Sequence, residues 1–144
     1  HQRWVNNKQF DGGQLSDEEK QLRDFYQRLL NFTISSEALM GAYEEIHFYN
    51  KEHTSGYDHR ILSYVRWSPN EKVLVVSNFE DSKSYELDLK IPESIIQKWS
   101  LEDGTYDFEE MLYQEQNRNM IVEGGKGNIA VKLNPLESLI LKLK

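Results

Sequence analysis

The sequence contains no cysteine, which excludes disulfide bonds, thiolate ligands for zinc and a cysteine nucleophile. It has no run of eighteen apolar residues, so we predict no membrane-spanning helix and no membrane partner. Basic residues are also scarce: 17 Lys and Arg stand against 24 Asp and Glu, a net charge of −7. Because a nucleic-acid-binding surface needs a basic stripe opposite the phosphates, no nucleic-acid partner is expected.

The length and the hydrophobic content of the chain suffice for one domain with a short additional segment. The chain has 144 residues, 38% of them hydrophobic, and it is rich in aromatic side chains, with three Trp, eight Tyr and six Phe. It begins at His1 without an initiator Met and without a signal peptide. We therefore expect the sequence to be part of a longer protein.

Residues 15–32 have the pattern of one amphipathic helix. Ser16 and Glu19 form a capping box, and acidic residues follow Ser16 at the positive end of the helix dipole. Large apolar residues then recur at helical spacing in a single stripe: Leu22, Phe25, Tyr26, Leu29 and Leu30. Full burial of such a side chain is worth roughly 1.5–3 kcal/mol, so this face is expected to need a partner surface. No other segment is predicted to be a helical partner for it.

From Tyr43 onward the pattern changes to short segments rich in β-branched and aromatic residues, separated by turn sequences. These segments predict strands at 43–49, 61–67, 73–78, 84–89, 106–112, 119–123, 128–133 and 138–143. Short helical turns are predicted at 36–40, ended by Gly41, and after Pro92. Eight strands without long intervening helices predict an all-β fold, an antiparallel β-sandwich with Greek-key topology. The most apolar segments, 73–76 and 139–143, are predicted to be central strands.

Several groups of residues follow one another in a recognisable order. The helix contains the pattern L-x-x-F-Y-x-x-L from Leu22 to Leu29, and Ala38, Leu39 and Gly41 come after it. Residues 73–78 read VLVVSN, and the last hairpin has the pattern L-x-P-x-x-x-x-I-L-x-L from Leu133 to Leu143. This ordered set resembles the C-terminal region of α-amylase-family enzymes, glycoside hydrolase family 13.

The resemblance implies a specific domain organisation. Residues 1–42 would be the end of a catalytic (β/α)8 barrel, consisting of a loop, the last barrel helix and a linker, and residues 43–144 would be the C-terminal β-sandwich domain. The family's three catalytic acids precede the last barrel helix, so they would lie before His1 and this chain would have no catalytic residue. A barrel also needs roughly 200 residues or more, which this chain does not supply. The resemblance further implies a parent enzyme acting on α-glucans, and it leaves the compartment open, with a periplasmic or secreted parent compatible with it.

No metal and no cofactor are expected. His47, His53 and His59 recur every six residues, which is neither helix nor strand spacing for a zinc site. Adjacent carboxylates, such as Glu109 and Glu110, point to opposite faces of a strand and cannot hold one substrate atom together. We expect such pairs to lie on the solvated surface.

Two classes of function remain open from the sequence. In the first, the sandwich is a structural accessory domain that packs on the missing barrel and stabilises it. In the second, it is a carbohydrate-binding module that holds starch-like glucan by aromatic stacking, with the contact candidates Trp4, Tyr64, Trp67 and Trp99. Against the second, Tyr64 and Trp67 point to opposite faces of one strand, and Trp99 follows a turn, where a core position is expected. Without the barrel, the helix stripe is also predicted to pair with a second copy of the chain.

Overall fold

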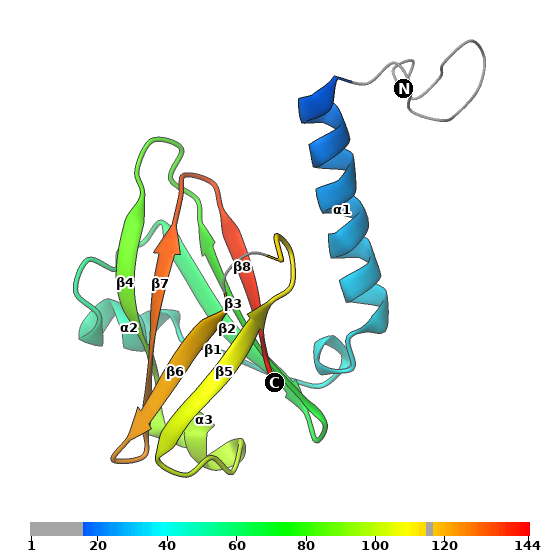
Figure 1. Ribbon diagram of the computed structural model, residues 1–144. Coiled ribbons are helices and arrows are strands. Elements are labelled where there is room, and N and C mark those ends of the chain that lie inside the picture. Colours follow the sequence, from blue (N-terminus) through cyan, green and yellow to red (C-terminus); the bar gives the residue numbers. More distant parts are fainter. Residues whose placement is uncertain (1–15, 115–116) are drawn as a thin grey trace. The chain divides into compact units, whose positions relative to one another are not determined.

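The computed structural model describes residues 16–114 and 117–144, in two compact units that comprise residues 1–35 and 36–144 (Figure 1). The first unit contains helix α1 (Asp17–Ser35). The predicted capping pair is present: the Glu19 N–H donates to Ser16 Oγ at 3.2 Å, and this hydroxyl donates to Glu19 Oε1 at 3.0 Å. The Glu19 carboxylate thus accepts from the capping hydroxyl.

The predicted stripe of α1 is described only in part. Leu30 is exposed. Nothing is described of the side chains at Leu22, Phe25, Tyr26 and Leu29, so their role as a docking face, and the pairing with a second copy, stay predictions.

The second unit is built on a single curled sheet. Its eight described strands, all paired antiparallel, are β1 (Ala42–Glu45), β2 (Ile61–Ser68), β3 (Glu71–Asn78), β4 (Tyr85–Ile91), β5 (Gly104–Glu110), β6 (Arg118–Glu123), β7 (Lys126–Leu133) and β8 (Ser138–Leu143). They follow the order β1-β2-β3-β8-β5-β6-β7-β4 across the sheet. The helices of this unit are the 3-10 turn η2 (Ala38–Met40), α2 (His47–His53) and α3 (Glu93–Lys98).

The curl places β5, β6 and β7 in front of β1, β2 and β3, which gives two layers (Figure 1). One hydrophobic core lies between the layers, because apolar residues from both halves of the sheet form a single buried cluster that includes Val65, Leu74, Leu89, Phe108, Ile129 and Leu141. Strand β4 reaches β5 through α3 and lies beside β7, which is a Greek-key arrangement. The predicted antiparallel all-β fold is confirmed. The two most apolar strands, β3 and β8, are central, as predicted, since each has neighbours on both sides.

The predicted strand at 43–49 is wrong in its second half. Strand β1 ends at Glu45, and residues 47–53 form α2 instead. The Glu45 carboxylate accepts hydrogen bonds from the backbone N–H groups of His47, at 2.7 Å, and Phe48, at 3.3 Å, which supplies acceptors for the unpaired first amides of the helix. The aromatic residues that suggested a strand sit on a helix whose Phe48 is exposed.

Candidate functional site

One outer face of the sandwich carries a group of apolar side chains among polar ones. Because side chains alternate along a strand and the strands are in register, the residues on β1, β2, β3 and β8 that point away from the core form one surface. Its apolar members on the strands are Tyr43, Leu62, Tyr64, Val73, Val75 and Ile140. Phe79, directly after β3, continues the same register because its N–H donates to the Arg60 oxygen at 2.8 Å, and we include it in what we call the outer apolar face. Val73, Val75 and Ile140 are buried, whereas Leu62 is 37% exposed and Tyr43 and Phe79 are each 56% exposed.

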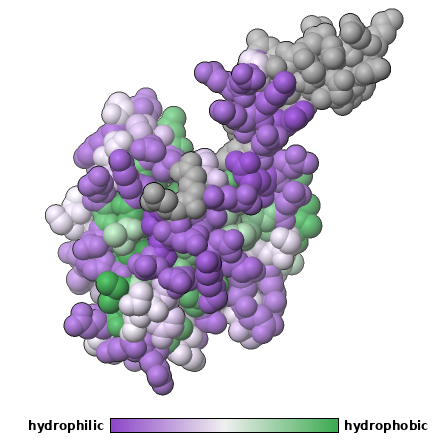
Figure 2. Space-filling view, in the orientation of Figure 1, coloured by the Kyte–Doolittle hydropathy of each residue, from purple (hydrophilic) through white to green (hydrophobic). Residues whose placement is uncertain are grey.

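The opposite outer face has a different character. The residues that point outward from β4, β5, β6 and β7 are mostly charged or polar, and they include Glu86, Asp88, Lys90, Asp107, Glu109, Asn119, Glu123, Asn128 and Lys132. Ile121 is an exception, an exposed apolar side chain among them. Figure 2 shows that hydrophilic residues predominate on the side of the molecule where β5, β6 and β7 lie in front. If both outer faces of the sandwich were covered only by water, apolar side chains would not be expected to gather on one of them.

Tyr64, a predicted carbohydrate contact, lies on the outer apolar face. Its ring centroid is 5.3 Å from that of Tyr43, with the planes tilted by 42°. The Arg66 guanidinium carbon lies 5.8 Å from the centroid of the Tyr43 ring. The Arg66 Nη2 also donates to the backbone oxygen of Gly41 at 3.2 Å, so the cationic group is held between the sheet and the preceding linker.

The linker between the two units is attached to the sheet through Glu71. Glu71 Oε1 accepts hydrogen bonds from the Ser36 hydroxyl and from the Ala38 N–H, the latter at 3.0 Å, while Lys142 Nζ lies 3.4 Å from Oε2. Burial alone would raise the pKa of Glu71, but these hydrogen bonds and the Lys142 charge lower it below its usual value. The attachment is therefore made with Glu71 ionised.

Gly41 allows the linker to reach the sheet. A Cβ at this position would lie 2.1 Å from the backbone oxygen of Trp67, a separation that two non-bonded atoms do not adopt. The next residue, Ala42, pairs with Trp67 as the first residue of β1. Since neither residue has a large side chain, the space beside the Trp67 indole is not filled by the chain.

This space is a hollow of about 570 Å³, which we call the tryptophan hollow; it lies between the end of the sheet and the end of α3. The indoles of Trp67 and Trp99 meet there edge to face, with ring centroids 6.5 Å apart and planes at 70°. Lys72, the cross-strand partner of Trp67, and Lys98 also line it. Two predicted carbohydrate contacts, distant in sequence, are thus neighbours.

Trp67 and Trp99 differ in accessibility. Trp67 is partly buried, whereas Trp99 is 3% exposed and packs against Phe108, with ring centroids 6.5 Å apart. The expectation of a core position for Trp99 is confirmed. Its indole Nε1 is buried, with no hydrogen-bond partner in the described part of the chain. Trp4 lies outside the described residues.

Glu110 contradicts the expectation that adjacent carboxylates are solvated. Glu109 is exposed, but Glu110 points into the sandwich and is only 3% exposed. Its Oε1 accepts the Leu112 N–H at 2.8 Å, and its Oε2 accepts those of Tyr113 and Gln114 at 2.6 and 2.8 Å. These bonds compensate the carboxylate for the loss of water and fold the segment that follows β5.

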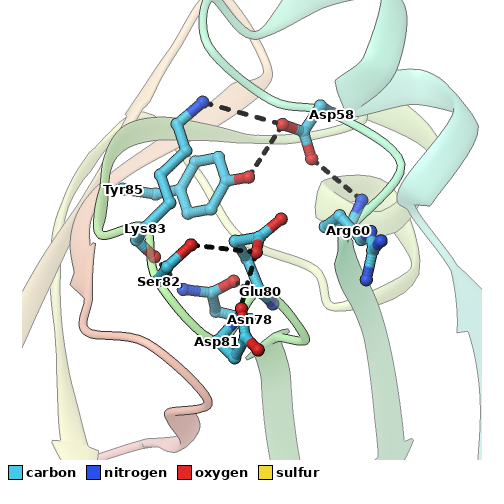
Figure 3. A network of polar contacts seen from close by, with 8 residues as sticks. All are labelled: Asp58, Arg60, Asn78, Glu80, Asp81, Ser82, Lys83 and Tyr85. Atoms are coloured by element: carbon cyan, nitrogen blue, oxygen red, sulfur yellow. Dashed lines mark hydrogen bonds and ion pairs between the residues drawn. The ribbon is translucent and has the colours of Figure 1, made fainter.

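A second polar cluster joins the loop before β2 to the start of β4 (Figure 3). Asp58 Oδ2 accepts the Tyr85 hydroxyl at 2.7 Å and lies 3.9 Å from Lys83 Nζ, and Asp58 Oδ1 accepts the Arg60 N–H at 2.8 Å. Burial, and then the hydrogen bond to Asp58, raise the pKa of Tyr85 to about 12. Through Tyr85 and Lys83 the Asp58 carboxylate ties the loop before β2 to the start of β4.

Within residues 16–114 and 117–144, no three His, Asp or Glu side chains lie together in an arrangement that could hold a metal ion. Over the same residues, none of the helices is both long enough and apolar enough to cross a membrane.

The comparisons with known proteins agree on one domain type. A family model described as the C-terminal all-β domain of α-amylase matches residues 52–144. One solved structure with a similar fold is an AmyP variant in complex with maltotriose, with a TM-score of 0.62 and 11% identity over 96% of this chain and 24% of that one. Another is the maltogenic α-amylase AmyB of Thermotoga neapolitana, with a TM-score of 0.57 and 16% identity over 83% of this chain and 24% of that one. An Anoxybacillus α-amylase is also similar, with a TM-score of 0.57 and 15% identity over 96% of this chain and 26% of that one. The chain thus spans about a quarter of the length of each; a search of curated proteins found no match.

Proposed function

Because the chain belongs to the family of α-amylase C-terminal all-β domains, we propose that it is the non-catalytic accessory domain of a glycoside hydrolase acting on α-glucans. In this proposal the domain packs against the catalytic barrel of the parent enzyme and stabilises it. Two of the similar solved structures are α-amylases about four times longer than this chain, which is consistent with a role as one part of such an enzyme.

The observation that carries the proposal is the outer apolar face. The core between the two layers already buries the inner side chains, so this second apolar surface is not required to close the sandwich. Its exposed members, Tyr43, Leu62 and Phe79, cost free energy in water and favour contact with another surface, whereas Val73, Val75 and Ile140 are already buried within this chain. Leu62, Phe79 and Tyr43 are still accessible, and covering a large apolar side chain is worth roughly 1.5–3 kcal/mol.

The attachment of the linker supports the same role. The chain enters the sandwich at Ser36 and Ala38, which Glu71 binds on the same side of the sheet as Val73 and Val75. Residues 36–38 therefore lie on the same side of the sheet as the outer apolar face. Since Gly41 fits closely against Trp67, this entry has little freedom to shift.

In this proposal the residues that catalyse glycoside hydrolysis belong to the catalytic barrel and not to this chain. We expect residues 1–144 alone to release no reducing ends from starch or maltotriose above the buffer background, because the family's catalytic acids would precede His1. A reducing-sugar assay on the purified chain tests this. Activity that disappears on substitution of an acidic residue of this chain would contradict it.

A pair of matched substitutions tests the docking role. Phe79 on the outer apolar face and Ile121 on the polar face are 56% and 55% exposed, so aspartate is equally accessible at both positions in the separate chain. In the whole enzyme, Phe79→Asp should lower stability by about 2 kcal/mol or more, because a charge is then buried in the contact. Ile121→Asp should change it by less than about 0.5 kcal/mol. Thermal inactivation of the whole enzyme measures the difference.

The separate chain provides the control. In residues 1–144 alone, both variants should unfold within about 0.5 kcal/mol of the unsubstituted chain, since both sites face solvent. If Phe79→Asp and Ile121→Asp destabilise the whole enzyme equally, the outer apolar face is not the docking surface.

A further inference from the structure

The tryptophan hollow has a composition that the core of the sandwich does not explain. It lies where the row Ala42, Trp67 and Lys72 runs across three neighbouring strands, and it faces the end of α3. The small side chain of Ala42 leaves one flank of the Trp67 indole open, and Lys72 forms the other flank. Its volume of about 570 Å³ lies in the range of small-molecule sites.

The lining combines an aromatic surface with the ammonium donors of two lysines. Lys98 Nζ lies 5.9 Å from the centroid of the Trp67 ring and 2.8 Å from Glu44 Oε1. An ammonium group has three donors, so Lys98 retains donors after binding Glu44. Because the Lys98 charge is already paired, the hollow is a weak site for an anion. It offers instead donors on Lys72 and Lys98, and the Glu44 carboxylate, which is outside the lining, holds Lys98 from beside the hollow.

We propose that the tryptophan hollow binds a pyranose sugar. A sugar ring has an apolar face that stacks on an indole, and its hydroxyl groups both accept and donate hydrogen bonds. In this site the ring stacks on Trp67, and its hydroxyls accept from Lys72 and Lys98. The buried Trp99 contacts Trp67 edge to face and limits how the Trp67 indole can move.

This site is separate from the proposed docking surface. Trp67 points to the opposite side of β2 from Tyr64 and Leu62, and the hollow lies at the end of the sheet rather than on its outer face. A sugar bound there and a barrel packed on the outer apolar face use different residues. Failure of one proposal therefore leaves the other intact.

The test is a titration of the 15N-labelled chain with maltotriose, followed through the indole N–H signals of Trp67 and Trp99. These signals are assigned with Trp67→Phe and Trp99→Phe. We expect both to shift along a saturable curve with a single half-saturation concentration. Ala42→Leu should weaken binding by about tenfold or more, because it fills the open flank of Trp67 from an exposed strand position without removing a core residue.

A matched control separates filling of the hollow from a general effect of added leucine. Ala130→Leu places the same side chain at an exposed position of β7 and should leave the titration unchanged. Lys72→Met should weaken binding without changing the urea midpoint by more than a surface substitution does. Absence of saturable shifts with maltotriose, equal shifts with sodium phosphate, or equal effects of the two leucine substitutions would overturn the proposal.

Discussion

Replacement of Leu141 by alanine is expected to lower the free energy of unfolding by about 2–5 kcal/mol. Leu141 is fully buried in β8, where it lies between Leu74 of β3 and Glu110 of β5 in the strand register. Removing three carbons there loses their transfer free energy and leaves a cavity, because central strands paired on both sides cannot move together to close it. Urea denaturation followed by tryptophan fluorescence measures the change.

Leu143 is the control for this prediction. It lies two residues further along β8, on the same face, but it is only partly buried. Leu143→Ala makes the same chemical change where water already reaches the side chain, so its effect should be clearly smaller. A loss below about 0.5 kcal/mol for Leu141→Ala would mean that β8 is an exposed edge rather than a central strand.

Glu110→Ala should destabilise the chain by about 3 kcal/mol, a large effect for removal of a charged residue. The carboxylate accepts the N–H groups of Leu112, Tyr113 and Gln114, and alanine would leave three buried or partly buried amides without this acceptor. Amide hydrogen exchange at residues 112–114 should accelerate together with the loss of stability, because these donors lose their shared partner.

The neighbouring Glu109 gives a matched comparison. It is exposed on the other side of the same strand, so Glu109→Ala should change stability by less than about 0.5 kcal/mol. Glu110→Gln keeps the shape but has one acceptor oxygen in place of two, and we expect it to fall between the parent chain and Glu110→Ala. Equal behaviour of Glu109→Ala and Glu110→Ala would show that the buried carboxylate contributes nothing to stability.

Much of the fold could be predicted because its signals are local. The alternation in residues 85–91 and 128–133 places Leu87, Leu89, Ile129 and Val131 in the core, and all four are buried. The capping pair, Ser16 and Glu19, was enough to predict where α1 starts. The failure at residues 46–49 has a physical reason: aromatic content favours a strand, but the Glu45 side chain supplies the acceptors that start a helix.

The residues that meet at the candidate sites could be predicted only in part, because some of their contacts join segments that are distant in the sequence. Alternation correctly separated Tyr64 from Trp67, because opposite faces of a strand follow from spacing. The neighbourhood of Trp67 and Trp99 depends on where α3 packs, and the part played by Ala42 and Lys72 depends on register between strands, neither of which is local. Glu110 was missed because its partners are backbone N–H groups, and these leave no pattern in side-chain chemistry.

The attachment of residues 36–41 also decides where this domain can be exchanged between enzymes. Ser36 and Ala38 donate to Glu71, so a transplanted sandwich that began at Ala42 would leave this carboxylate with Lys142 as its remaining described partner. Gly41 would have to travel with the sandwich as well, because any larger residue from the recipient collides with the Trp67 carbonyl. A chimera joined just before Ser36 keeps the foreign joint outside these contacts and is the exchange that the structure tolerates.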